Sequence, residues 1–309
     1  VTGAAGSIGS ELCRQLCHFG LKQLVLFDSA ETPMHNIRLE LEEKFPDVEF
    51  TPVMGDIRMI HRVESIYQRF HPQLVFHAAA YKHVPLMEEN PCEAVHTNVY
   101  GTRNVADMAV KYDVDKFIMV STDKAVNPTN VMGASKRLAE MYVQSLSIAI
   151  SKGRHSGKTR FITTRFGNVL GSNGSVIPRF REQLAKGGPL TVIHPDIIRY
   201  VMTIPEACRL VLEAAFMGKG NEIFVFDMGT PVKIANLARR MIELAGLVPG
   251  EDIEIKYTGL RPGEKLYEEL LATKENTLPT ENEKIYRAQV REYDYEDICT
   301  LMSPLIDLA

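Results

Sequence analysis

An acid and a base stand side by side at the end of a predicted strand. Asp123 and Lys124 follow the apolar run at 117–120, and Met132 and Lys136, four residues apart, share one face of the helix that comes next. The carboxyl ends of parallel strands face the ligand crevice. A carboxyl group and an amine placed there could donate and remove protons, which favours general acid–base chemistry. The alternative is a solvent-exposed ion pair, the commoner arrangement of adjacent opposite charges.

A glycine-rich turn lies at the start of the sequence. Gly3, Gly6 and Gly9 stand where a strand runs into a helix, so that bare backbone can approach a pyrophosphate and the helix N-terminus contributes positive dipole. Asp28 ends the next strand, where its carboxylate can bind a ribose diol and would repel a 2′-phosphate. The pattern predicts a site for NAD rather than NADP, against the alternative of a plain turn with an exposed aspartate. Asp56, after the following strand, is by position a candidate adenine contact.

Short apolar runs alternate with longer amphipathic ones along the chain. This β–α repetition has the spacing of a parallel, doubly wound sheet. The predicted strands are 24–27, 50–53, 74–77, 117–120, 161–164 and 223–226. The predicted helices are 7–19, 33–44, 60–70, 94–112, 131–150, 205–217 and 234–244. Residues 1–3 are typical of the end of a further, central strand, so we expect residues upstream of Val1.

Two regions are predicted. Residues 1–170 form a NAD-binding Rossmann domain, to which the elements at about 205–228 return. Residues 171–204 and 229–309, in which regular patterning gives way to loops containing Gly and Pro, form a smaller, interleaved substrate-binding region. The predicted fold class is therefore α/β, with a doubly wound parallel Rossmann sheet.

Composition excludes several other classes of protein. The 309 residues are 45% apolar and 24% charged, and their net charge of −4 provides no basic field for nucleic acid or an anionic membrane. No apolar run is long enough to span a bilayer, and no signal-peptide pattern is present. Cys13 and Cys17 lie one helical turn apart without His or Cys partners nearby, which predicts core packing rather than a metal site.

Several motifs, in order, resemble those of one family. Besides the glycine turn they are 77–85 (HAAAYKHVP), 98–102 (NVYGT), 121–128 (STDKAVNP), 165–171 (RFGNVLG) and 261–265 (RPGEK). Over nearly its whole length the chain resembles the extended short-chain dehydrogenase/reductases. Within them it is similar to the nucleotide-sugar 4,6-dehydratases of the CapD-like polysaccharide biosynthesis family.

One position departs from the usual pattern of these enzymes. The family usually carries Tyr-x-x-x-Lys, in which the lysine lowers the pKa of the phenol so that tyrosinate can take a hydroxyl proton. Met132 stands at the tyrosine position, and a thioether has no proton to give. Either the fold has become a non-catalytic NAD-binding sensor, or the chemistry has moved to other groups. The resemblance favours the second hypothesis, because UDP-N-acetylglucosamine 4,6-dehydratases that retain the C5 configuration have methionine here and keep Thr-Asp-Lys, whereas inverting relatives keep the tyrosine.

The resemblance implies a dehydration without net redox change. Hydride leaves sugar C4 for NAD⁺, the C4 ketone acidifies the C5 proton, and after loss of the C6 hydroxyl the hydride returns to C6. Lys124, if neutral, would take the C5 proton, and Asp123, if protonated, would donate to the departing hydroxyl. Thr122 would bond the C4 oxygen and Lys136 the nicotinamide ribose. Asp123, Lys124 or a water held by Thr122 could take the C4 hydroxyl proton, and the sequence does not choose among them.

Binding residues are assigned by the same resemblance. Arg199 and Arg261 suit bidentate phosphate contact, although either could form a surface salt bridge instead. Glu264 would accept from the uridine ribose, and Asn98 could equally bridge backbone groups. The predicted catalytic residues are Thr122, Asp123, Lys124, Met132 and Lys136. The predicted cofactor-binding residues are Gly3, Gly6, Ser7, Ile8, Gly9, Asp28, Asp56, Ile57, Ala78, Ala79, Ala80, Lys82, Asn98 and Lys136. The predicted substrate-binding residues are Lys82, His83, Asn168, Val176, Arg199, Arg261 and Glu264.

The predicted function is NAD-dependent dehydration of UDP-N-acetylglucosamine to the 4-keto-6-deoxy sugar, with the C5 configuration retained, for surface polysaccharide or glycan biosynthesis. The alternatives are a C5-inverting dehydratase, a nucleotide-sugar 4-epimerase, which needs no acid for C6 elimination, and the non-catalytic sensor. By resemblance we expect a homo-oligomer formed through the helices at 94–112 and 131–150. We expect the catalytic unit in the cytoplasm, with the parent protein held at the inner face of a bacterial membrane by a region ahead of Val1.

Overall fold

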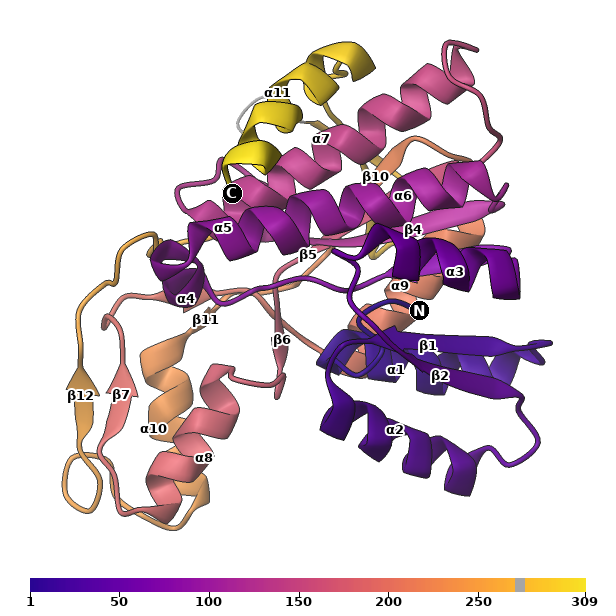
Figure 1. Cartoon of the computed structure of the whole chain (residues 1–309). Helices are drawn as coiled ribbons and strands as arrows, with labels where there is room; N and C mark the ends of the chain where they lie inside the picture. Colours follow the sequence, from indigo (N-terminus) through magenta and orange to yellow (C-terminus); the bar gives the residue numbers. More distant parts are fainter. Residues whose placement is uncertain (270–275) are drawn as a thin grey trace.

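The computed structural model describes residues 1–269 and 276–309 and confirms an α/β fold built on a mainly parallel sheet (Figure 1). The parallel strands are β1 (Leu24–Asp28), β2 (Phe50–Met54), β3 (Leu74–His77), β4 (Lys116–Thr122), β5 (Arg160–Phe166) and β10 (Glu222–Phe226). Beyond β10 the sheet continues with two antiparallel strands, β14 (Ile285–Gln289) and β13 (Asn276–Pro279). All six predicted strands are present.

A single residue joins the two parts of this sheet. Thr2 lies between β1 and β3 and forms parallel bridges with Phe27 and His77. The Thr2 amide donates to the Phe76 carbonyl at 2.9 Å, and the Phe27 amide donates to the Val1 carbonyl at 2.9 Å. The position expected for a central strand is therefore held by this short extended segment, and the strand order is β2–β1–Thr2–β3–β4–β5–β10–β14–β13.

Helices cover both faces of the sheet, which makes the fold doubly wound. One face carries α1 (Ser7–Leu16), α2 (Glu31–Lys44) and α9 (Ile204–Met217), and the other carries α3 (Ile60–Phe70), α6 (Thr102–Lys111) and α7 (Val131–Ser151). Each layer is filled by its own cluster of buried apolar side chains. Cys13 and Cys17 are buried in the first cluster, which confirms their predicted packing role.

The segment expected to be one helix at 94–112 is interrupted. A π-helix, η2 (Val95–Gly101), separates α5 (Pro91–Ala94) from α6. The Thr102 hydroxyl donates to the Asn98 carbonyl at 2.7 Å, and the buried Asn98 side chain bonds both the amide and the carbonyl of Tyr81, at 2.8 and 3.0 Å. These bonds offset the poorer hydrogen bonding of the wide π-helical turn. The spacing of apolar residues alone does not reveal such a turn.

A smaller lobe lies beside the carboxyl ends of the strands. It consists of α8 (Val176–Ala185), α10 (Ile234–Leu244), β7 (Leu190–Val192) and β12 (Ile255–Tyr257), packed around buried side chains that include Phe180. Two short ladders link this lobe to the larger part: β6 (Asn168–Leu170) with β9 (Val201–Thr203), and β8 (Ile198–Arg199) with β11 (Val232–Lys233). The assignment of this region to substrate binding stays a prediction.

The last helix covers part of the face where we expected contact between subunits. Helix α11 (Tyr295–Leu308) packs on α7 and buries Ile298 and Met302 in the second apolar cluster. An oligomer formed through the helices at 94–112 and 131–150 stays a prediction, and it would have to accommodate α11. None of the helices in residues 1–269 and 276–309 has both the length and the apolar character needed to cross a bilayer.

A buried ion pair ties α7 to β5. Arg165 Nη2 lies 2.8 Å from Glu140 Oε2, and the two side chains are 0% and 1% exposed. Glu140→Ala would leave an uncompensated buried charge, so we expect it to lower the free energy of unfolding by about 3–5 kcal/mol in urea denaturation. The control is Glu182→Ala, which breaks an exposed pair with Lys186 and should cost less than about 1 kcal/mol. Equal losses in the two variants would contradict the prediction.

Candidate active site

The glycine turn and the carboxyl ends of β3, β4 and β5 border one cleft of about 620 Å³ beside the smaller lobe. Most of the predicted site residues line it. They are Gly3, Gly6, Ser7, Ile8, Gly9, Ala78, Ala80, Lys82, His83, Thr122, Lys124, Met132, Lys136, Asn168, Val176, Arg199, Arg261 and Glu264. The predicted site residues that are not among the lining residues are Asp28, Asp56, Ile57, Ala79, Asn98 and Asp123.

The glycine turn brings backbone segments too close together for side chains. Gly3 has a φ of +66°, and a Cβ on it would lie 2.6 Å from the Ala79 amide nitrogen. A Cβ on Gly9 would lie 1.9 Å from the Gly3 carbonyl oxygen. Gly6 caps α1 without a side-chain hydrogen bond, which leaves the first-turn N–H groups available to an anion. The arrangement fits a pyrophosphate.

The two predicted cofactor carboxylates are engaged with the protein. Asp28 Oδ2 accepts from the Ala5 amide and Oδ1 from the Ala30 amide, both at 2.9 Å, so this side chain fixes the glycine turn to the end of β1. Asp56 lies 2.7 Å from Arg58 Nη2. Burial raises the pKa of Asp56, but the hydrogen bonds from Arg58 outweigh it and hold the pKa below its usual value. Direct contacts of either carboxylate with a ribose or an adenine stay predictions.

Asn98 lies beneath the cleft surface. Its amide donates to the Tyr81 carbonyl and to the Ser135 hydroxyl, both at 3.0 Å, and its oxygen accepts from the Tyr81 amide. Asn98 therefore bridges backbone groups of Tyr81, and its contact with the cofactor stays a prediction. In this position it fixes the loop that carries Lys82 into the cleft, where Lys82 is among the lining residues.

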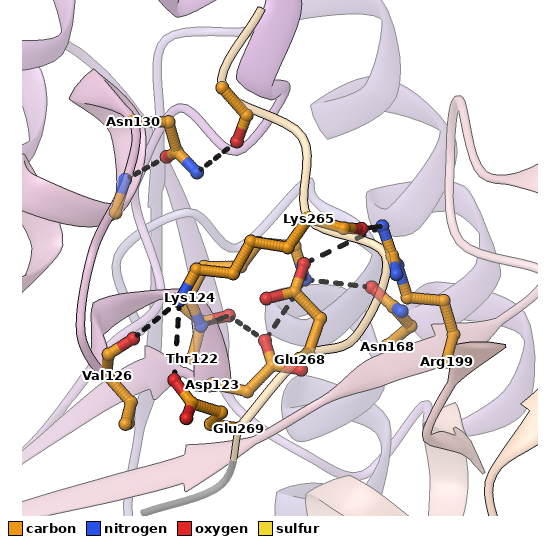
Figure 2. A network of polar contacts seen from close by, with 12 residues as sticks. Thr122, Asp123, Lys124, Val126, Asn130, Asn168, Arg199, Lys265, Glu268 and Glu269 are labelled. Carbon is orange, nitrogen blue, oxygen red and sulfur yellow. Dashed lines mark hydrogen bonds and ion pairs between the residues drawn. The ribbon is translucent and has the colours of Figure 1, made fainter. Parts of the chain in front are cut away.

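The acid and the base form a buried cluster at the end of β4 (Figure 2). Asp123, which is 0% exposed, accepts at Oδ1 from the Thr122 hydroxyl at 2.9 Å and from Lys124 Nζ at 3.0 Å. Lys124 Nζ also donates to Asn168 Oδ1 at 3.1 Å. The exposed-ion-pair alternative is wrong, because water is largely excluded from both side chains. Asp123 Oδ2 is buried and has no hydrogen-bond partner among the described residues, which is uncommon for a carboxylate oxygen.

Helix α7 presents Met132 and Lys136 to the same cleft. Asn130 caps the helix by accepting from the Gly133 amide at 2.7 Å, and a Cβ on Gly133 would lie 2.2 Å from the Lys124 carbonyl oxygen, so the helix starts directly against the cluster. Met132 is 2% exposed and packs with apolar residues of α4 (Val84–Glu89). Lys136 Nζ donates to the Val120 carbonyl at 2.9 Å, and burial lowers the pKa of Lys136 to about 8.

The low pKa of Lys136 makes folding stability depend on pH. Its ordinary pKa is 10.5, so between about 8 and 10.5 the unfolded chain binds more protons than the folded one, and stability rises with pH. Relative to Lys136→Met, the wild type should gain up to about 3 kcal/mol of unfolding free energy across this window, measured by urea denaturation at a series of pH values. Exposed Lys111 supplies the control. Relative to Lys111→Met, the wild type should show no such gain in unfolding free energy across this window. A difference that falls as pH rises would contradict the burial argument.

On the substrate side, several predicted residues contact the protein itself. Arg199 donates to the carbonyls of Ile198, Lys265 and Leu266, at 2.8, 2.8 and 3.1 Å. Its side chain is largely buried, so the surface-salt-bridge alternative is wrong for it. Arg261 is exposed, and its amide donates to Glu264 Oε2 at 3.2 Å in a tight turn. Phosphate or ribose contact by these residues stays a prediction.

Two further predicted residues, Lys82 and His83, follow β3. Lys82 Nζ donates to the Ser172 hydroxyl at 3.3 Å, and burial together with the charge of Lys124 lowers the pKa of Lys82. Burial, with the charge of Lys82, also lowers the pKa of His83, whose ring packs against Gly174. Val176, half-buried at the start of α8, faces the same cleft. Among residues 1–269 and 276–309, no three His, Cys, Asp or Glu side chains are grouped to hold a metal ion.

The sequence interpretation missed Glu268. Its Oε1 lies 3.8 Å from both Lys124 Nζ and Arg199 Nη2, and its side chain is 6% exposed. Burial raises the pKa of Glu268, against the opposing charge of Lys124. The available signal was the Arg-Pro-Gly-Glu-Lys motif, which ends only three residues earlier at Lys265. A glutamate in an irregular segment carries no periodicity that would distinguish it from a surface residue.

Comparisons with known proteins place the chain in a family. A family profile described as polysaccharide biosynthesis protein matches residues 1–290. The capsular polysaccharide biosynthesis protein CapD of Staphylococcus aureus is 50% identical over 308 residues, which are 99% of this chain and 50% of CapD. The chain thus spans about half the length of the curated relatives it matches.

Solved structures agree with the fold. Pen from Bacillus thuringiensis has a TM-score of 0.83 and 32% identity, covering 97% of this chain and 94% of that one. A double mutant of DesIV, a dTDP-glucose 4,6-dehydratase from Streptomyces venezuelae crystallised with NAD, has a TM-score of 0.74 and 22% identity, covering 86% and 85%. At that identity DesIV shows the shared Rossmann fold alone. The profile match and the CapD identity, both extending over most of the sequence, establish that the chain belongs to the polysaccharide biosynthesis protein family.

Proposed function

We propose that this chain is the catalytic part of an NAD-dependent 4,6-dehydratase that acts on UDP-N-acetylglucosamine and retains the C5 configuration. The observation that carries the proposal is the buried Thr122–Asp123–Lys124 cluster, which opens into the same cleft as the glycine turn although methionine replaces the usual tyrosine. Family membership and the fold shared with a dTDP-glucose 4,6-dehydratase support it.

The cofactor side of the cleft fits NAD. The glycine turn and the first turn of α1 would hold the pyrophosphate, and Lys136, whose Nζ lies beside β4, would contact the nicotinamide ribose. The nicotinamide of NAD, when bound, supplies the acceptor and the donor of one hydride. Asp28 keeps the turn in shape through its bond to Ala5, which makes its carboxylate a positioning group as well as a candidate ribose ligand.

Elimination from a sugar already oxidised at C4 needs one base and one acid. A neutral Lys124 amine takes the C5 proton, while Asp123 gives a proton to the C6 hydroxyl, which leaves as water as the C5–C6 double bond forms. Lys124 Nζ and Asp123 Oδ1 are in contact. The proton on C5 can therefore be removed, and the oxygen on C6 protonated, from one side of the sugar ring. This same-side arrangement supports return of the proton to C5 with its configuration unchanged.

The C4 hydroxyl proton also has a route that needs no tyrosine. The Thr122 hydroxyl donates to Asp123 Oδ1 at 2.9 Å and can accept from a sugar hydroxyl at the same time. A proton passed along this pair would arrive on the carboxyl group that later protonates the leaving C6 hydroxyl. Thr122 and Asp123 thereby replace the missing phenol.

The test is incubation of the chain with UDP-N-acetylglucosamine and NAD⁺ in D₂O, with products followed by NMR. A 4-keto-6-deoxy sugar carrying deuterium at C5, with C5 unchanged in configuration, is the expected product. Inversion at C5 would keep the dehydratase and reject retention. A C4 epimer with C6 intact would identify an epimerase, and tight binding of both ligands without turnover would favour the sensor.

A further inference from the structure

The segment after the Arg-Pro-Gly-Glu-Lys motif crosses the catalytic end of the sheet. Arg199 holds its backbone by donating to the carbonyls of Lys265 and Leu266. On the other side, Lys265 Nζ donates to the Asn127 carbonyl at 2.7 Å, in the loop that follows Lys124. The segment is therefore fixed at two points, one close to the smaller lobe and one beside the catalytic cluster.

Glu268 extends from this segment into the space between two cations. Its Oε1 lies 3.8 Å from Lys124 Nζ and 3.8 Å from Arg199 Nη2, and Figure 2 shows it between them. Both separations are longer than a hydrogen bond, so the carboxylate is attracted by the two charges without being bound closely to either. A change in the charge around one cation will therefore shift the carboxylate relative to the other.

We propose that Glu268 is a positioning residue that couples occupation of the sugar-nucleotide subsite to the placement of Lys124. The inference rests on the proposed function and on the predicted contact of Arg199 with the substrate phosphates. An anionic diphosphate at Arg199 competes with Glu268 for that guanidinium. The carboxylate then turns to the Lys124 ammonium, its other cation, and draws it away from Asp123. The carboxylate can accept the ammonium proton, whose loss leaves the neutral Lys124 amine that acts as the base.

The burial of Glu268 supports this role. A carboxylate that is 6% exposed exerts its charge on Lys124 with little screening by water, so a small displacement has a large effect. An uncharged isostere would keep the packing but lose this pull. Glu269, the next residue, contacts Lys265 at 3.5 Å and Asn127 at 3.1 Å and is about half exposed, which makes it a matched control on the same segment.

The experiment compares Glu268→Gln, Glu268→Asp and Glu269→Gln with the wild type. For Glu268→Gln we expect kcat to fall about 10- to 100-fold while KM for UDP-N-acetylglucosamine changes less than about threefold. The C5 deuterium isotope effect should rise, because proton removal by a misplaced Lys124 becomes rate-limiting. Glu268→Asp, which keeps the charge, should recover part of kcat, and Glu269→Gln should behave as wild type. Wild-type kcat and isotope effect in Glu268→Gln would overturn the proposal.

A second readout separates this proposal from the proposed function. If the wild type does not convert UDP-N-acetylglucosamine, the proposed function fails, and the coupling is measured with UDP alone. UDP should then change the rate at which acetic anhydride modifies Lys124, followed by peptide mass spectrometry, by at least about threefold in the wild type and in Glu269→Gln. The change should be lost in Glu268→Gln. Equal changes in all three proteins would overturn the coupling.

Discussion

Lys124→Ala should abolish exchange of the sugar C5 hydrogen with solvent and lower turnover of UDP-N-acetylglucosamine by about 10²- to 10⁴-fold. The Lys124 amine is held at the cleft by Asp123 and Asn168, and alanine has no group that could take the C5 proton from the same place. Deuterium incorporation in D₂O, followed by NMR together with steady-state rates, measures both effects. NAD affinity should change less than about twofold, because the glycine turn is untouched.

Met132→Ala provides the contrast. Met132 lines the same cleft but cannot carry a proton, so this variant should retain measurable dehydration. Its burial predicts a loss of about 2–5 kcal/mol in unfolding free energy, and Met132→Leu, which conserves volume, separates that loss from the chemistry. Continued C5 exchange in Lys124→Ala, with Met132→Leu folded but inactive, would reverse the roles assigned to these two residues.

Gly9→Ala should disrupt the turn at the start of α1 and remove NAD binding. The added Cβ would lie 1.9 Å from the Gly3 carbonyl oxygen and 2.8 Å from Ala4 Cα, and both neighbours are backbone atoms that can move only if the turn itself moves. We expect a loss of about 3 kcal/mol or more in unfolding free energy, measured by urea denaturation, and loss of NAD binding measured by calorimetry.

Gly6→Ala is the control for this substitution. Gly6 has a φ of −76°, and a Cβ there would lie 3.3 Å from the Gly3 carbonyl oxygen, so the fold should tolerate alanine at a cost of about 1 kcal/mol. NAD affinity should still fall, because the methyl group occupies the approach of a pyrophosphate. Wild-type stability and NAD affinity in Gly9→Ala would show that the turn has a different geometry or a different use.

The regular part of the fold is predictable from sequence because its elements repeat with a clear period. Strands such as β3 (Leu74–His77) and helices such as α3 (Ile60–Phe70) occupy the residues that apolar patterning indicates. The ladders of the smaller lobe contain two or three residues per strand, too few for any alternation to be visible. Helix α11 contains Pro304, which reads as a helix breaker although the helix continues through it.

The candidate site was predictable where side chains capable of acid–base chemistry stand at the end of a predicted strand. Asp123 and Lys124 stand out because adjacent opposite charges end a buried strand. Asn168 and Arg199 were assigned to substrate binding by resemblance, and in the structure their side chains also bind Lys124 and the backbone at 265–266. Residue type limits the kinds of group that a side chain can bind, but the partner depends on tertiary placement. Glu268 was missed for the same reason.

The π-helix η2 makes the local structure sensitive to the number of residues in this part of the chain. A π turn accommodates one residue more than an α turn, so deletion of one residue within Val95–Gly101 would close the wide turn into ordinary α-helical winding and displace Asn98 relative to α6. Asn98 would then face away from Tyr81, and the loop carrying Lys82 would lose its anchor. The number of residues between Tyr81 and Thr102 is therefore constrained. An insertion or deletion there should disturb the loop that carries Lys82 more than most substitutions would.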